Sequence, residues 1–276
     1  MTPIDRTEAA AHACSVHGYL ERLHVSGSPE PSRETLFALQ EAHVLNIPYE
    51  NLDILAGRPL SLDIPDIYEK IVVRRRGGYC FELNGLFAWL LRALQFDVKE
   101  YYGRFLLGEP LEMPMRRHRI VRVRIGGDVY ICDVGVGIPA PRFPLLFAEN
   151  EVQRQGDESY RIVRHKTLGW VVETFLKEAW QRLYCFTEDE QYPIDFAMPH
   201  HWCTTHPDSI FLNYTMAYIR TPDGRRTIAD VVDADGNKAV EFRTFGRDGV
   251  TTFIPRTDAD YRDALKAYFG IELDNG

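Results

Sequence analysis

Residues 74–84 read RRRGGYCFELN, and this segment leads into the most apolar helix that the sequence predicts. Gly77 and Gly78 allow the backbone to turn sharply just before Cys80. From Cys80 to Leu94 the chain is apolar nearly all round, which is typical of a helix that packs on most of its sides. We therefore expect a helix that begins at Cys80 and lies at the centre of the fold.

The position of Cys80 indicates a reactive thiol. In the first turn of a helix, free backbone N–H groups and the positive end of the helix dipole favour a thiolate, and they lower a cysteine pKa from about 8.5. The alternative is a small thiol that only packs in the core. A nearby base is the feature that separates these two interpretations.

Helical periodicity extends over the chain on the N-terminal side of Cys80. An apolar stripe follows the N-cap candidate Ser32 and ends at Pro48. A second stripe begins near Asp66 and stops before Gly77. Residues 1–96 are therefore predicted to form a helical region that carries the nucleophile.

After residue 96 the residue pattern changes from helical periodicity to short β-rich runs, which predict an antiparallel sheet or barrel over residues 97–204. Three more strands and a last helix, Asp258–Phe269, are expected in residues 205–276. We find no linker long enough to separate the three regions, so an α+β body is predicted. The predicted barrel strands are Val98–Phe105, Arg119–Ile125, Val129–Val134, Tyr160–Val163, Trp170–Thr174 and Gln181–Phe186, and the later ones are Thr215–Arg220, Thr227–Val232 and Ala239–Thr244.

A hairpin supplies the base. A two-residue turn at Gly126-Gly127 pairs Ile125 with Asp128 and, further along the strands, Ile120 with Asp133. His118 then lies on the same face as Asp133 and diagonal to it, with Cβ atoms somewhat under about 7–8 Å apart. A register shift of one residue would put the two on opposite faces. Cys132 is expected on the other face beside Val121, as a packed thiol.

Together Cys80, His118 and Asp133 make a nucleophile, a base and a carboxylate that orients the base. His118 would take the thiol proton of Cys80. Asp133 would fix the tautomer of the ring and stabilise its positive charge. The alternative for the His118–Asp133 pair alone is a structural hydrogen bond that satisfies a buried carboxylate.

With these motifs in the same order, the chain resembles the arylamine N-acetyltransferases. Cys80 and His118 are 38 residues apart and His118 and Asp133 are 15 apart, in agreement with that family's pattern. The motifs that carry the resemblance are Arg33-Glu34-Thr35-Leu36 with Ala42-His43, Ile47-Pro48-Tyr49-Glu50-Asn51-Leu52, Arg76-Gly77-Gly78-Tyr79-Cys80 with Glu82 and Asn84, His118, Asp133-Val134-Gly135 with Gly137, and Thr205-His206-Pro207-Asp208-Ser209-Ile210-Phe211.

The resemblance implies a helical bundle, a β-barrel and a C-terminal α/β lid around a cysteine-protease-like core. It also implies acetyl-CoA as the acyl donor, with no permanently bound cofactor. The acceptor would be an arylamine, arylhydroxylamine or hydrazine, and the acetyl group would pass through Cys80 by double displacement. The partners are then small molecules alone.

The resemblance also implies roles around the triad. Arg117, Gly135 and Gly137 would contact the donor, and Glu50 and Arg76 would form a structural ion pair beneath the nucleophile. Val136 and Phe211 would contact the acceptor; the full substrate-contact set is Arg117, Gly135, Val136, Gly137 and Phe211.

Two residues depart from the family pattern. Arg117 stands where a threonine is common, and Val136 stands where an aromatic side chain is usual. Arg117 either meets a CoA phosphate or points to solvent in the basic cluster of residues 116–119. Both departures concern the preference for donor and acceptor rather than the type of reaction.

Composition excludes several other classes. The 276 residues carry 40 acidic and 32 basic side chains, and a net charge of −8 opposes binding to nucleic acid or to anionic lipid. The apolar runs are too short for a membrane span, and the first residues lack the apolar core of a secretory signal. Five cysteines, an odd number without a local framework, favour a reducing cytoplasm.

Other interpretations concern metals and related reactions. Residues 200–206, HHWCTTH, hold zinc-type ligands, but their spacing fits no common zinc site, and we expect no metal. Residues 233–237, DADGN, resemble the start of a calcium loop but place glycine at the fourth position, so a hairpin turn explains them better. An amide synthase, a hydrolase of thioesters or amides with the same triad, and a non-catalytic CoA-binding relative remain alternatives.

Overall fold

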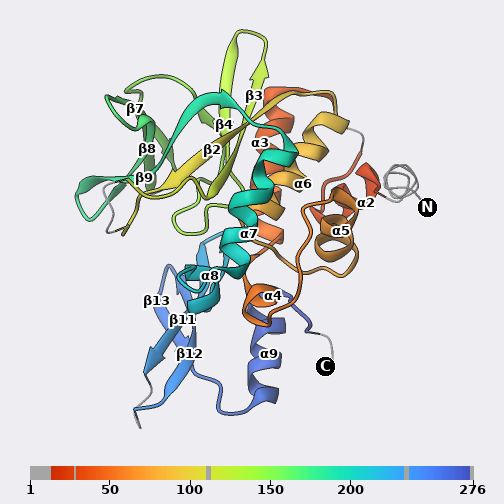
Figure 1. Cartoon of the computed structure of the whole chain (residues 1–276), viewed down its shortest axis with the longest axis vertical. Coiled ribbons are helices and arrows are strands. Elements are labelled where there is room, and N and C mark those ends of the chain that lie inside the picture. Colours follow the sequence, from red (N-terminus) through yellow and green to blue (C-terminus); the bar gives the residue numbers. More distant parts are fainter. Residues whose placement is uncertain (1–13, 28, 110–112, 233–235, 274–276) are drawn as a thin grey trace.

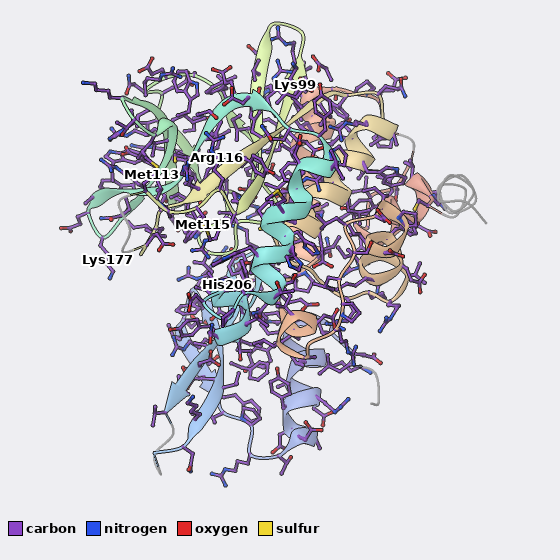
Figure 2. The ribbon with its side chains drawn as sticks, in the orientation of Figure 1. Lys99, Met113, Met115, Arg116, Lys177 and His206 are labelled. Carbon is purple, nitrogen blue, oxygen red and sulfur yellow. The ribbon has the colours of Figure 1, made fainter. Side chains whose placement is uncertain are left out.

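The structure is a computed structural model that describes residues 14–27, 29–109, 113–232 and 236–273. N-terminal helices lie beside an eight-stranded sheet, and a five-stranded sheet with the last helix extends from one end of that pair (Figure 1). The α+β class predicted from the sequence is confirmed. Figure 2 places Lys177, in a turn between two strands of the eight-stranded sheet, on the side of the molecule away from the N-terminal helices.

The first helices follow the local signals closely. Helix α3 (Arg33–Asn46) begins after Ser32, whose hydroxyl accepts a hydrogen bond from the Thr35 N–H at 3.1 Å, and it ends just before Pro48. The stripe near Asp66 forms α5 (Ile64–Tyr68), which continues as the π-helical turn η1 (Glu69–Val73). The sequence did not predict two shorter helices, α2 (Val16–Arg22) and α4 (Leu52–Leu55).

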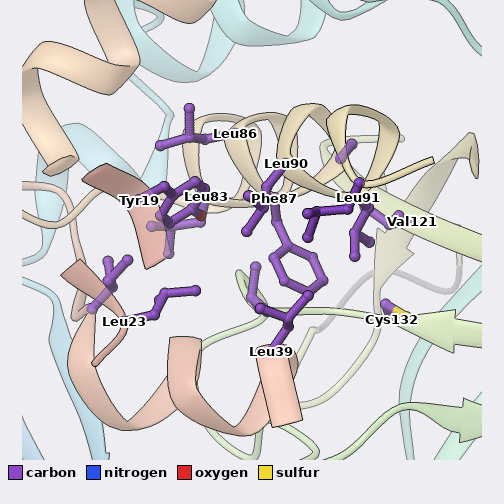
Figure 3. Close-up of a cluster of buried hydrophobic side chains, with 14 of the residues drawn as sticks. Tyr19, Leu23, Leu39, Leu83, Leu86, Phe87, Leu90, Leu91, Val121 and Cys132 are labelled. Carbon is purple, nitrogen blue, oxygen red and sulfur yellow. The ribbon is translucent and has the colours of Figure 1, made fainter. Parts of the chain in front are cut away.

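Helix α6 (Cys80–Ala93) is the centre of the core, as predicted. Most of its apolar side chains, among them Leu83, Phe87 and Leu91, are fully buried, and Trp89 is partly buried. One side of the helix packs on α2 and α3, and another side meets Val121 and Cys132 from the sheet (Figure 3). A helix covered from both directions buries apolar residues around most of its circumference, which explains its sequence.

The larger sheet is antiparallel throughout and curls into a nearly closed barrel. A β-bridge between Glu149 and Ile162 connects the segment that follows one edge strand to a strand next to the opposite edge. Its strand order is β5-β4-β3-β2-β9-β8-β7-β6. The strands are β2 (Asp97–Phe105), β3 (His118–Ile125), β4 (Asp128–Cys132), β5 (Leu145–Leu146), β6 (Gln153–Gln155), β7 (Glu158–His165), β8 (Gly169–Leu176) and β9 (Ala179–Glu190).

The β3–β4 hairpin has the predicted register. Ile125 pairs with Asp128 across the Gly126-Gly127 turn, and Val121 pairs with Cys132. Val121 and Cys132 belong to the core shared with the helices, whereas Ile120 belongs to the barrel interior. The packed position predicted for Cys132 is therefore confirmed.

The smaller sheet joins distant parts of the chain. Its order is β1-β10-β11-β12-β13, so the short strand β1 (Tyr49–Glu50) adds an N-terminal edge through pairs with Tyr218 and Ala217. The other strands are β10 (Ala217–Thr221), β11 (Gly224–Val232), β12 (Lys238–Gly246) and β13 (Gly249–Phe253), the last of which was not predicted. Helix α9 (Asp258–Phe269) has the predicted bounds and packs Leu265 and Phe269 against Phe242.

Between the sheets the chain is helical over the last part of the region predicted as barrel (residues 97–204), where the sequence predicted no strand after Phe186 and no helix. A 3₁₀ turn, η2 (Pro193–Phe196), leads into α7 (Ala197–Thr205), and α8 (Ile210–Asn213) follows. The sequence of α7 hides this helix because Cys203 is its one buried residue, so it has no broad apolar stripe. The domain boundaries at residues 96 and 204 stay predictions. Within the described ranges, no helix is long and apolar enough to cross a membrane.

Candidate active site

Cys80 is the first residue of α6, and glycines allow the backbone to come close around it. A Cβ on Gly77 would lie 2.2 Å from the carbonyl oxygen of Pro48, and a Cβ on Gly135 would lie 2.8 Å from the Cα of Cys80. Neither position tolerates a side chain. These contacts fix the nucleophile candidate between the start of α6 and the loop that follows β4.

His118 and Asp133 meet as the hairpin register predicted. His118 Nε2 lies 2.5 Å from Asp133 Oδ2, and both side chains are buried. This bond leaves Nδ1 as the ring nitrogen available to Cys80. The Cys80 thiol donates to the Arg117 carbonyl at 3.6 Å, so it lies beside the residue that precedes His118.

The pKa of His118 favours the protonated ring. Burial alone would lower this pKa, but the charge of Asp133 and its hydrogen bond outweigh burial and raise it to about 10. The ring therefore retains, as an imidazolium, the proton that it accepts from the thiol. A positive charge at this place is what a thiolate needs as its partner.

Burial raises the pKa of Cys80 above its ordinary value, while the hydrogen bond to His118 and the charge of His118 lower it. The expectation that the helix start lowers this pKa is therefore wrong in its net direction. The physical reason is desolvation, because burial disfavours the charged thiolate more strongly than His118 favours it. Formation of the thiolate depends on His118 rather than on the helix alone.

A buried network of charges lies beneath Cys80. Arg76 Nη2 lies 2.9 Å from Glu50 Oε1, which confirms the predicted ion pair, and Arg76 Nη1 lies 3.2 Å from Asp53 Oδ1.

Lys70 extends this network toward the start of α6, because its Nζ lies 3.1 Å from Asp53 Oδ2 and 2.8 Å from Glu82 Oε1. Glu82 also accepts the Tyr79 N–H at 3.1 Å, just before the nucleophile. Sequence reasoning missed Asp53 and Lys70, whose spacing gave no signal.

A pocket of about 250 Å³ opens onto Cys80 and His118. Each donor or acceptor residue predicted from the sequence lines it, whereas Asp133 lies behind His118. The walls come from the helical part, the barrel and the smaller sheet, so only the folded chain assembles them. The predicted lining residues are Arg117, Gly135, Val136, Gly137 and Phe211, and those not predicted are Tyr49, Phe105, Ile138, Ile210, Met216, Ala217, Tyr218 and Ile228.

Arg117 is not directed to solvent. Its guanidinium Nη2 lies 2.5 Å from Glu109 Oε2, and only 11% of its side chain is exposed. The solvent alternative for Arg117 is therefore wrong. The ion pair places a neutralised cation in the wall of an otherwise largely apolar pocket.

The His- and Cys-rich segment on α7 serves packing. His200 Nδ1 bonds to the Tyr79 hydroxyl and its Nε2 bonds to the carbonyl of Leu60, so both ring nitrogens are used. Cys203 is buried, and His206 stacks on Trp202 where α7 ends (Figure 2). Among the described residues, no three His, Cys, Asp or Glu side chains form a group that could hold a metal ion. The calcium-like segment begins at residues 233–235, which lie outside the described residues.

Comparison with known proteins agrees with this geometry. A family model described as N-acetyltransferase matches residues 32–276. A relative from Salmonella typhimurium, "Arylamine N-acetyltransferase / N-hydroxyarylamine O-acetyltransferase", is 36% identical over 209 residues, which are 76% of this chain and 74% of the relative. The chain belongs to the arylamine N-acetyltransferase family.

Two further members of this family match nearly the whole chain. The arylamine N-acetyltransferase of Mycolicibacterium smegmatis is 34% identical over 268 residues, which are 95% of this chain and 93% of the relative. The structure of the arylamine N-acetyltransferase of Mycobacterium marinum in complex with CoA matches with a TM-score of 0.81 and 31% identity, and it covers 93% of both chains. The arylamine N-acetyltransferase fold therefore extends over all three parts of this molecule.

Proposed function

We propose that this protein transfers an acetyl group from acetyl-CoA, through a thioester on Cys80, to an arylamine, an arylhydroxylamine or a hydrazine. The observation that carries the proposal is the Asp133–His118 bond of 2.5 Å beside Cys80, at the bottom of a pocket that opens onto the thiol. Family membership supports the same donor and acceptor classes. The partners we propose are these small molecules, and five free cysteines support a cytoplasmic location.

The first half of the reaction loads the enzyme. His118 takes the proton of Cys80, and the thiolate attacks the carbonyl carbon of the thioester of acetyl-CoA. The C–S bond to CoA breaks, and the CoA thiolate leaves with the proton held by His118. Asp133 stabilises the imidazolium during this step because it accepts a hydrogen bond from Nε2.

The second half discharges the acetyl group. The acceptor nitrogen, or the oxygen of a hydroxylamine, attacks the carbonyl carbon of the acetyl-Cys80 thioester. The bond to Sγ breaks, and the proton of the acceptor passes through His118 back to the thiolate. An apolar pocket favours an aromatic acceptor because it buries the ring and leaves the nucleophilic atom near the thioester.

We assign contacts within the pocket in the same way. Gly135, Gly137 and Arg117 are placed next to the acetyl donor, and Val136 and Phe211 next to the acceptor. All five line the pocket together with Cys80. The two glycines support a close approach of the donor, since they add no side chain beside the nucleophile.

The decisive experiment is the intact mass of the protein after mixing with acetyl-CoA alone and then with an added arylamine. We expect an acetyl adduct that the arylamine discharges to acetylated product. Cys80→Ala should form no adduct, whereas Cys14→Ala, in the N-terminal part, should behave as the wild type. Discharge at the same rate without any amine would support a hydrolase, and no adduct on the wild type would contradict the proposal.

A further inference from the structure

We propose that Asn84 is a positioning residue for acetyl transfer, because its side chain joins the helix that carries Cys80 to the strand ends that carry His118 and Asp133. The inference rests on the proposed function, since it assigns Asn84 a part in that reaction. Asn84 would act through Asp133, without contact with donor or acceptor.

The side chain of Asn84 is fully buried and makes three hydrogen bonds. Its Nδ2 donates to Asp133 Oδ1 at 2.9 Å and to the carbonyl oxygen of Arg119 at 2.6 Å. Its Oδ1 accepts the Val134 N–H at 2.9 Å. A backbone N–H only donates and a carbonyl only accepts, so these neighbours allow one orientation of the amide.

The position of Asn84 along α6 explains why it reaches both strands. It follows Cys80 by four residues, so the two side chains lie on the same face of the helix, one turn apart. Arg119 is next to His118 and Val134 is next to Asp133 in the sequence. The Asn84 side chain therefore binds Arg119 next to His118, Val134 next to Asp133, and Asp133 itself.

These bonds determine how the carboxylate of Asp133 faces the imidazole. Oδ1 receives N–H groups from Asn84 and from Gly135, both at 2.9 Å, and Oδ2 is left for His118. Without Asn84, Oδ1 keeps one donor and the carboxylate can rotate away from His118. His118 then loses part of the interaction that raises its pKa, and Cys80 loses the cation that opposes the effect of burial.

The chain offers a matched control at Asn51. Its Nδ2 donates to the carbonyl oxygens of Phe211 and Tyr214, and its Oδ1 accepts the Met216 N–H, each at 2.8 Å. Asn51 is as buried as Asn84 and also makes three hydrogen bonds, but both of its acceptors are backbone carbonyls. It has no bond to Asp133 or His118, so its loss measures the structural cost of such a residue, including any shift of the pocket wall at Phe211 and Met216, without a change at the triad.

The experiment compares Asn84→Ala with Asn51→Ala. For each we would measure Tm, the rate of thioester formation from acetyl-CoA, and the alkylation of Cys80 by iodoacetamide against pH, followed on the peptide that contains Cys80. We expect both to lower Tm. Only Asn84→Ala should slow thioester formation, by about 10–100-fold as for other residues that orient a reacting group, and move the midpoint of alkylation to higher pH.

A second variant keeps the test valid if Asn84→Ala does not fold. Asn84→Asp has the same shape, but a second carboxylate this close to Asp133 raises the pKa at which the pair loses its last proton. At low pH a shared proton restores the bond to Asp133, so thioester formation should fall as pH rises through the raised pKa of the pair. Asn51→Asp places no second carboxylate at the triad and should lack this fall.

Other ionisable groups near Asp133 do not account for the expected pH dependence of alkylation and thioester formation. Burial holds the pKa values of three nearby groups well above the tested range, and Arg119 is paired with Glu100. The three groups are Tyr49, Cys132 and Tyr184.

Two results would overturn the positioning role. One is a wild-type alkylation profile in Asn84→Ala, and the other is the same pH dependence of thioester formation in Asn84→Asp and Asn51→Asp. Failure of the proposed function gives a different result, because the wild type would then form no acetyl adduct while the alkylation profiles still compare Asn84 with Asn51.

Discussion

His118 is fixed by a bond on one side of its ring, and its other ring nitrogen is available for the proposed proton transfer. Its Nε2 is held by Asp133, its ring packs on Tyr184 with centroids 5.4 Å apart, and a Cβ on Gly103 would lie 3.2 Å from its Cδ2. The ring therefore has little freedom to turn. A fixed ring supports proton transfer to and from Cys80, because the transfer requires a short and well-aligned path.

The substitution Asp133→Asn tests the electrostatic part of this arrangement. The neutral amide cannot stabilise the imidazolium, so the pKa of His118 should fall toward its ordinary value and that of Cys80 should rise further. We expect kcat to fall on the order of 10⁴-fold, as in the analogous serine triad. Alkylation of Cys80 by iodoacetamide should require higher pH. Asp128→Asn, at the exposed turn of the same hairpin, is the control, and an unchanged profile in Asp133→Asn would refute the triad.

Val136 tests the acceptor side of the pocket. A phenylalanine there would add a ring contact of about 0.5–1.5 kcal/mol, which is about three- to tenfold in affinity. We expect the wild type to favour bicyclic arylamines over small anilines, and Val136→Phe to reverse that order. The measurement is kcat/KM for one amine of each kind in both proteins. Phe105 and Phe211 also line the pocket, and an unchanged ratio would mean that they already supply the aromatic wall.

At the scale of elements, α3 contains an acid-sensitive residue. His43 is fully buried between Tyr19 and Phe87, and within the described structure neither ring nitrogen has a hydrogen-bond partner. Burial, with a smaller effect of Arg22, lowers the pKa of His43 to about 3. The native state therefore keeps this ring neutral at pH values where the unfolded chain binds a proton.

His43 should make the protein less stable in acid. Its pKa is lower in the folded state, so its contribution is complete above about pH 6.5 and is lost as pH falls toward about 3. The loss should approach about 1.4 kcal/mol of unfolding free energy for each pH unit in this window. Urea unfolding against pH should show a shallower loss in His43→Leu than in the wild type. His201→Leu, at an exposed histidine, should keep the wild-type slope, and equal slopes in all three would contradict the prediction.

At the scale of the whole molecule, the buried ion pairs of Arg76 lie where its parts meet. Glu50 is on β1, which belongs to the smaller sheet, while Arg76 lies in the segment that enters α6. Asp53 on α4 is the second partner of Arg76. The network therefore fixes the smaller sheet relative to the helix of the nucleophile.

Loss of Arg76 should be costly because it leaves the buried Glu50 carboxylate without its cation. We expect Arg76→Met to lower the free energy of unfolding by about 3–5 kcal/mol, measured by urea unfolding. Lys99→Met removes the exposed ion pair of Lys99 with Glu190 and should cost far less, since water screens that pair. Equal losses in the two variants would mean that the buried pair has no special structural role.

The amino-acid sequence by itself determined the features that depend on neighbours along the chain. The N-cap at Ser32, the start of α6 at Cys80, the register of the β3–β4 hairpin and the bounds of α9 all follow from periodicity, capping and turn geometry. Because the hairpin register fixes which side chains share a face, the His118–Asp133 contact was also predictable.

Only the tertiary structure decided the rest. The bonds of Asn84 across two strand ends, the Arg117–Glu109 pair and the pocket walls from Tyr218 and Ile228 join residues with no periodic relation in the sequence. The raised pKa of Cys80 likewise reflects burial by every part that packs around it. Local patterns contain torsional and capping preferences, whereas desolvation and contacts between distant segments exist only after the chain has folded.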